Sequence, residues 1–146
     1  MNADERRFKH ADLTEQIIGV FYEVYNDLGC GFLEKVYQEA MALVLTNKGI
    51  DVQREVSLPV WFRGVQIGSY EADLVVAGVV LVELKACRAL DTSHEAQVLN
   101  YLRATELEVG LLFNFGPKPQ LRRFAFENVR KRISVHLRPS AAKGSS

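Results

Sequence analysis

Three charged residues stand inside two apolar, strand-like runs, and this feature constrains the chain more than any other. Asp73 lies in the first run and Glu83 and Lys85 in the second, within the segment YEADLVVAGVVLVELKA. Side chains alternate along a strand, so Glu83 and Lys85 point to the same face. A hairpin turn near Gly78 then places Asp73 opposite Glu83. Because desolvating unpaired charges costs several kcal/mol each, such a cluster needs a compensating partner.

Composition places this cluster in an ordinary globular chain. The 146 residues are 48% hydrophobic and 25% charged, with no net charge, which excludes disordered and collagen-like classes. No apolar run is long enough to span a bilayer, and the first ten residues lack the apolar core of a secretory leader. Two cysteines predict no disulfide framework, so we expect a cytoplasmic protein. We expect a polar segment over 1–11, one domain over 12–138 and a disordered tail over 139–146.

Two helices are predicted at the start of the domain. Apolar residues recur with helical spacing from Leu13 to Leu28 and again from about Phe32 to Lys48. Asp12 is a plausible N-cap of the first helix, and Gly29 is a stop signal at its end.

The periodicity then changes to that of strands. Extended patterns over about 52–62, 65–76 and 79–86 predict an antiparallel meander, and a helix follows from about Ser93, with Thr92 and Glu95 in capping-box spacing. The apolar run 109–115 is expected inside the sheet, covered on both sides, and 122–126 as a last strand before a short element reaching Leu137. The element order α-α-β-β-β-α-β-β predicts an α/β fold with a central sheet flanked by helices.

The charged cluster favours a divalent cation. Hard cations such as Mg²⁺ or Mn²⁺ prefer carboxylate oxygens, which Asp73 and Glu83 would supply, and Lys85 could orient a water or stabilise developing charge. This arrangement suits phosphodiester hydrolysis. The alternative is a structural ion pair at the rim of the sheet. The three histidines lack the spacing of zinc ligands.

At this point the chain resembles a known superfamily. Asp73, nine further residues and then Glu83-Leu84-Lys85 are similar to the signature of the PD-(D/E)xK nucleases, although Ala72 stands where the superfamily's name has proline. Gly31, Glu34 and Tyr37 have the spacing of its GxxExxY branch, and Gln97 and Tyr101 resemble the QxxxY motif of RecB-like nucleases. The likeness extends from about residue 13 to residue 126 and implies a restriction-endonuclease-like core with a mixed sheet.

The resemblance also implies roles for individual residues. Glu34 would be an additional metal ligand, with capping of free helix N–H groups as its alternative. Gln97 would hydrogen-bond the lysine, a water or the substrate backbone, and Tyr101 would contact phosphate or stack on a base; a polar helix edge is the alternative for both. Arg122 and Arg123 belong to a basic C-terminal region that is either a phosphate-contacting surface or a solvated rim.

Two classes of function therefore stay open. The first is a Mg²⁺- or Mn²⁺-dependent nuclease that acts on DNA, with RNA as the less favoured substrate. The second is a nucleic-acid-binding or protein-interaction module on the same fold, without turnover, which the neutral total charge favours. A homo-oligomer or a larger complex is compatible with both.

Overall fold

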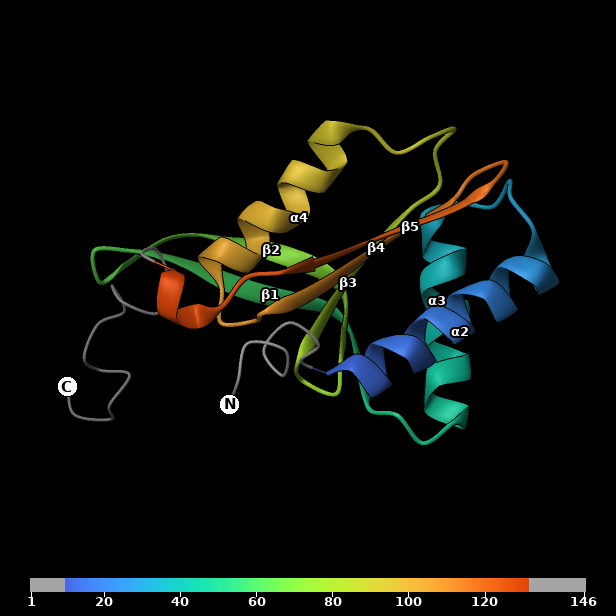
Figure 1. Cartoon of the computed structure of the whole chain (residues 1–146), viewed down its shortest axis with the longest axis horizontal. Helices are drawn as coiled ribbons and strands as arrows, with labels where there is room; N and C mark the ends of the chain where they lie inside the picture. Colours follow the sequence, from blue (N-terminus) through green and yellow to red (C-terminus); the bar gives the residue numbers. More distant parts are fainter. Residues whose placement is uncertain (1–9, 132–146) are drawn as a thin grey trace.

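The computed structural model of the protein describes residues 10–131 (Figure 1). Its elements follow the predicted order. They are the helices α2 (Ala11–Leu28), α3 (Glu34–Asn47) and α4 (Thr92–Ala104), the strands β1 (Val52–Phe62), β2 (Val65–Val76), β3 (Val80–Lys85), β4 (Val109–Phe115) and β5 (Pro119–Ala125), and a terminal 3₁₀ turn over Asn128–Arg130. The predicted tail over 139–146, the element reaching Leu137 and most of the segment 1–11 lie outside the described residues.

The five strands form one mixed sheet in the order β1-β2-β3-β4-β5. The first three make the predicted antiparallel meander, and β5 pairs antiparallel with β4. Strands β3 and β4 are parallel, because the chain crosses over through α4 between them. The α/β class with a central mixed sheet is therefore confirmed.

Helices cover both faces of the sheet, with α2 and α3 on one side and α4 on the other (Figure 1). Every residue of β4 is buried, as its uninterrupted apolar run predicts. On the α2–α3 face, Phe21 of α2 stacks on Phe113 of β4, and Tyr37 of α3 stacks on Phe115. These ring pairs fix the two helices against the strand that adjoins β3.

The predicted caps of two helices are wrong. The N-cap of α2 is His10, in a left-handed conformation, and Asp12 lies inside the first turn. The N-cap of α4 is Asp91 instead of Thr92: its carboxylate accepts from the backbone N–H groups of Ser93 and His94, and the His94 ring accepts from the N–H of Asp91. An extended backbone at Asp91 brings its side chain back over these donors, so the capping box begins one residue earlier.

Two element boundaries also differ from expectation. Helix α3 begins at Glu34 instead of Phe32, because the N–H of Phe32 donates to the Tyr37 hydroxyl outside the helix. Strand β5 begins at Pro119, three residues before the expected Arg122, and at an edge the missing proline N–H costs no ladder hydrogen bond. Gly29 ends α2 as predicted, with a positive φ of 68°.

The site is positioned by a separation of strands. β1 and β2 pair over nearly their whole length, whereas β2 pairs with β3 only from Leu74 to Val76, next to the hairpin turn. Beyond Leu74 the two strands share no further ladder pairs. At the same level β1 carries Glu55 with a positive φ of 53°, so both neighbours of Asp73 in the sheet are irregular there.

Candidate active site

Asp73 and Glu83 bridge the separating strands through reciprocal hydrogen bonds. The backbone N–H of Asp73 donates to Oε1 of Glu83 (3.0 Å), and the N–H of Leu84 donates to Oδ2 of Asp73 (2.8 Å). Each carboxylate thus replaces a backbone carbonyl that the ladder would otherwise supply. The predicted juxtaposition of these two residues across the hairpin is therefore present in the structure.

The alternation of the core explains where these side chains lie. Val82 and Leu84 pack toward α2 and α3, and Leu81 packs toward α4, so Glu83 and Lys85 share the α4 side of β3. On β2, Ala72 and Val75 both belong to the α4-side cluster, which breaks the alternation at Asp73. The irregularity turns Asp73 into the gap between the strands.

Burial and like charge act together on the two carboxyl groups. Glu83 is only 6% exposed, and its burial, followed by the charge of Asp73, raises its pKa to about 7. Burial also raises the pKa of Asp73, and the charges of Glu34 and Glu55 add to this effect. The hydrogen bond from Leu84 opposes the shift. Two acids with raised pKa values at one place in the fold are typical of functional sites.

Lys85 and Glu34 act on this pair from two sides. The charge of Lys85 lowers the pKa of both Asp73 and Glu83. Glu34, in the first turn of α3, approaches Asp73 closely enough to raise its pKa. Within residues 10–131, however, no three acidic, histidine or cysteine side chains converge on one metal position. The role of Glu34 as a direct ligand stays a prediction.

Aromatic residues connect Glu83 to α4. Tyr70 of β2 stacks on Tyr101 of α4, and its buried hydroxyl faces Glu83 without a hydrogen bond of normal geometry. Burial and the nearby charge of Glu83 raise the pKa of Tyr101, while a hydrogen bond from Gln97 opposes this shift. Gln97 and Tyr101 are four residues apart on α4, and the ring stacking of Tyr101 on Tyr70 connects this helix to the site.

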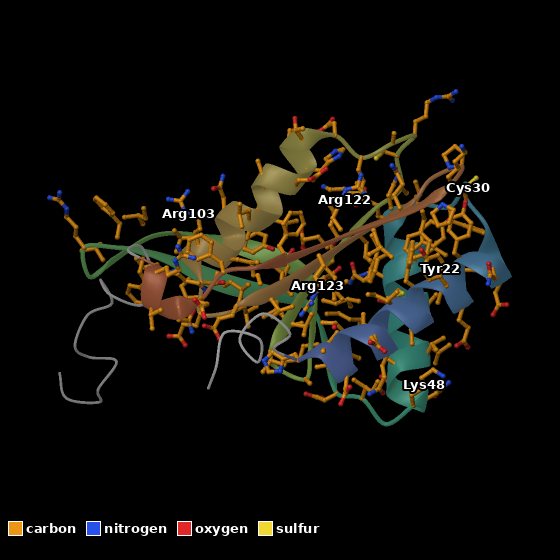
Figure 2. The ribbon with its side chains drawn as sticks, viewed as in Figure 1. Tyr22, Cys30, Lys48, Arg103, Arg122 and Arg123 are labelled. Carbon is orange, nitrogen blue, oxygen red and sulfur yellow. The ribbon has the colours of Figure 1, made fainter. Side chains whose placement is uncertain are left out.

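The structure does not bring the two arginines of β5 together. Arg122 lies opposite Leu112, a core residue on the α4 side, and forms an ion pair with Glu95 at 3.4 Å. Arg123 lies opposite Leu111 on the other face. In Figure 2 the two labels lie on different sides of the strand. Only Arg122 shares the face of α4 with Gln97 and Tyr101.

Sequence reasoning missed several residues of this region. Glu55 is one: it accepts an ion pair from Lys35 at 2.5 Å and its charge acts on Asp73. Gln38 is another, a buried amide beside Glu55 that stands four residues after Glu34, a spacing that could have identified it. Tyr70 had no signal, because an aromatic residue in a strand usually belongs to the core. Tyr37 of the GxxExxY spacing has a structural role: its side chain is buried, and its hydroxyl donates to the carbonyl of Gly29 at 2.6 Å.

The donor set fits a hard divalent cation. Asp73 and Glu83 each spend one interaction on a backbone N–H, which leaves carboxylate lone pairs for an ion. Mg²⁺ is commonly held by one or two protein carboxylates together with waters and substrate oxygens, so a third carboxylate is not required. A cation would also offset the burial and repulsion that raise the two pKa values.

Together, the mixed sheet, the helices on both faces and a bridged carboxylate pair where two strands separate define an α/β domain with an acidic candidate site. The family model described as the PD-(D/E)XK nuclease superfamily matches residues 11–124, and the chain belongs to this superfamily. All of the elements described above, up to the greater part of β5, lie within the match.

The comparison with solved structures supports the fold alone. The chain is similar to a structure described as "Crystal structure of SSO0001", with a TM-score of 0.50 and 19% sequence identity. That likeness covers 64% of this chain, and this chain spans 50% of the other. No curated protein matches the chain. Among residues 10–131, no helix is both long and apolar enough to cross a membrane.

Proposed function

We propose that this protein is a Mg²⁺- or Mn²⁺-dependent nuclease of the GxxExxY branch that hydrolyses phosphodiester bonds of DNA. The observation that carries the proposal is the reciprocal bridging of Asp73 and Glu83 next to Lys85, at the one place where β2 and β3 separate. Membership in the nuclease superfamily supports it. Burying two acids side by side is costly for stability, so a role in binding a cation accounts for their placement.

Each residue has a separate task in this mechanism. Asp73 and Glu83 would hold the cation, and the backbone N–H groups of Asp73 and Leu84 keep the two carboxylates in place. When bound, the cation would polarise the phosphoryl group and supply a more acidic water. Lys85, on the same side of β3 as Glu83, would orient the attacking water and stabilise the negative charge that develops on the phosphoryl oxygens.

Residues around the pair would complete the site. Glu34 would act from the first turn of α3, through a water or directly. Gln97 and Tyr101 would contact the substrate backbone from α4, since Tyr101 is half-buried and its neighbour Gln97 is exposed. Arg122 on the same face would add a phosphate contact once its pairing with Glu95 is released, and Arg123 would contact phosphate only from the opposite face.

A cleavage assay with point variants tests the proposal. Labelled single-stranded, duplex and branched DNA, and RNA of matched sequence, are incubated with the protein and Mg²⁺, Mn²⁺ or chelator. We expect metal-dependent cleavage of DNA that Asp73→Asn, Glu83→Gln and Lys85→Met each reduce at least a hundredfold. Glu71→Gln is the matched control, because Glu71 lies on β2 but is exposed.

Two outcomes would contradict the proposal. Cleavage that persists in chelator, or that survives equally in Asp73→Asn and Glu83→Gln, would remove the metal site from the mechanism. Nucleic-acid binding without any cleavage, in both metals and with every substrate, would instead favour the non-catalytic module. Light scattering of the same preparations gives the oligomeric state.

A further inference from the structure

A shallow basic hollow lies beyond the carboxyl ends of β3 and β4. It has a volume of about 370 Å³ and is lined by the loop that follows β3 and the turn that joins β4 to β5, through Arg88, Ala89, Pro117, Lys118, Pro119 and Gln120. Figure 1 shows this loop and this turn at the same end of the sheet. Hydrogen bonds between them confirm that they adjoin: the N–H of Leu90 donates to the Gln120 side chain at 2.9 Å.

The lining favours an anion. Arg88 and Lys118 are both exposed, and no acidic residue lines the hollow. Within the described part of the chain, the ion pairs of lysine and arginine with carboxylates involve Lys35, Lys48, Arg54 and Arg122, and include neither Arg88 nor Lys118. Two cationic residues that line one hollow without a protein carboxylate provide a site for a phosphate-sized anion.

Gln120 adds a donor whose orientation is fixed. Its Oε1 accepts from the N–H of Leu90 and from Nδ2 of Asn114, at 2.9 and 3.1 Å. Because both neighbours are donors, the amide oxygen must face them, and the Nε2 group is the unused donor of this side chain. Prolines on both sides of Lys118 restrict the backbone of the turn, so the hollow is largely preformed.

A buried asparagine connects the hollow to β3, the strand that carries Glu83 and Lys85. Asn114 of β4 is the parallel partner of Lys85 and is fully buried. Its side chain accepts from the N–H of Cys87 and donates to the Cys87 carbonyl, both at 2.9 Å, and donates to Gln120. These bonds continue the pairing of β3 past its end, so Lys85 and the hollow are held in one rigid unit.

The separation between Lys85 and the hollow is short. Arg88 follows Lys85 by three residues, and such a segment reaches at most about 10 Å. A nucleic-acid strand advances about 3.4 Å along its axis for each phosphate, so the hollow lies within about three phosphates of the reacting position.

We propose that Arg88, Lys118 and Gln120 form a subsite for one backbone phosphate of the nucleic-acid substrate, one to three nucleotides from the cleaved bond. This inference rests on the proposed function and deepens it. The subsite supplies the grip that a neutral chain needs and lays the strand along the carboxyl ends of β3 and β4.

The experiment measures binding separately from cleavage. The affinity of Asp73→Asn protein for fluorescent DNA is measured at several salt concentrations, with and without Arg88→Gln and Lys118→Gln. We expect the double substitution to weaken binding about tenfold and to lower the salt slope by about one phosphate. In the cleavage assay, the same substitutions in the wild-type background should raise KM more than they lower kcat.

The control removes the same charges elsewhere. Lys48→Gln with Arg103→Gln takes away one lysine and one arginine at the ends of α3 and α4, which Figure 2 shows on other parts of the surface. This control double substitution should leave the affinity for DNA within about twofold of that of the Asp73→Asn protein. Both double variants change only exposed side chains, and thermal unfolding confirms that they fold.

A neutral-linkage scan locates the contact. DNA strands carrying one uncharged methylphosphonate are tested position by position. A methylphosphonate at a single position within three nucleotides of the cleaved bond should weaken binding to the Asp73→Asn protein. The same strand should bind the Arg88→Gln, Lys118→Gln variant of that protein as the unmodified strand does. Such loss of additivity identifies a direct contact.

Two results would overturn the subsite. Unchanged affinity and salt slope in the double variant would do so, even if the wild-type protein cleaves DNA and the proposed function stands. Competition by millimolar inorganic phosphate, with no sensitive position in the scan, would assign the hollow to a free anion. If binding depends on the hollow but no substrate is cleaved, the subsite stands and the proposed function fails.

Discussion

The replacement of Glu83 by glutamine should change stability in opposite directions with and without a divalent cation. Glutamine keeps the shape of glutamate and an oxygen that accepts from the N–H of Asp73, so it removes the charge and little else. In the chelated protein this charge is buried and lies beside Asp73, and both effects raise the pKa of Glu83 from 4.5 to about 7.

The shift sets the size of the effect. A pKa of about 7 in the folded state against 4.5 in the unfolded state means that the folded protein binds more protons between these values. Stability of the chelated protein should therefore fall as pH rises from about 4.5 to about 7, by roughly 3 kcal/mol, and then level off. At pH 8, Glu83→Gln should be more stable than the wild type by up to this amount.

A bound cation should reverse this order of stability, so that the wild type becomes more stable than Glu83→Gln. With Mn²⁺ or Mg²⁺ at a hundred times its dissociation constant, binding to the folded state alone adds about 2.7 kcal/mol. For a chain of this length this corresponds to a rise in Tm of about 9 °C. Glu83→Gln lacks one of the two proposed ligands and should show little or none of this rise.

Urea unfolding followed by circular dichroism, at pH 5 and pH 8 with chelator or cation, measures the free energies of unfolding, and thermal unfolding in the same buffers measures the change in Tm. Glu71→Gln is the control and should follow the wild type in every condition, since Glu71 is exposed. A Glu83→Gln protein that is less stable than the wild type in chelator at pH 8 would refute the electrostatic reasoning. An equal response of wild type and variant to the cation would refute the assignment of Glu83 as a ligand.

Two further predictions concern the surroundings of the site. A methyl group on Gly116 would overlap the Cys87 carbonyl and crowd the Asn114 amide, so Gly116→Ala should destabilise the protein by about 1–3 kcal/mol and lower kcat. The control is Gly19→Ala, which adds a methyl group in open space on α2 and should not destabilise the protein. If both variants behave alike in urea unfolding, the role of Asn114 is contradicted. The Lys131 ammonium donates to the carbonyls of Thr105 and Leu107, and burial lowers the pKa of this lysine to about 8. The free energy of unfolding should therefore rise as pH increases from about 8 to about 10.5. This rise should be absent from Lys131→Met when unfolding is measured across that range, and a rise that persists in the variant would refute the assignment to Lys131.

The sequence predicted most of the elements because their signals are local. The meander, the buried β4 and the two opening helices follow from the spacing of apolar residues, and this spacing reflects which faces are buried. The caps failed for a local reason of another kind. Asp91 and Thr92 are both acceptable cap residues, and only the backbone conformation decides which side chain reaches the free N–H groups.

The candidate site was predicted in part. Asp73 and Glu83 could be placed opposite each other from the position of the turn alone, because the register of a hairpin is set there. Their exchange of backbone hydrogen bonds could not be predicted, since it requires that the two strands separate at this level. Tyr70 and Glu55 were missed because their roles arise from the neighbours that the fold gives them.

The sequence by itself thus determined that two acids and a lysine stand within apolar strands, since a local pattern encodes secondary structure and register. Only the tertiary structure decided that Glu34 approaches Asp73 and that the loop after Lys85 forms a basic hollow with a distant turn. These are contacts between residues far apart in the chain. They depend on packing and crossover geometry, which no local pattern specifies.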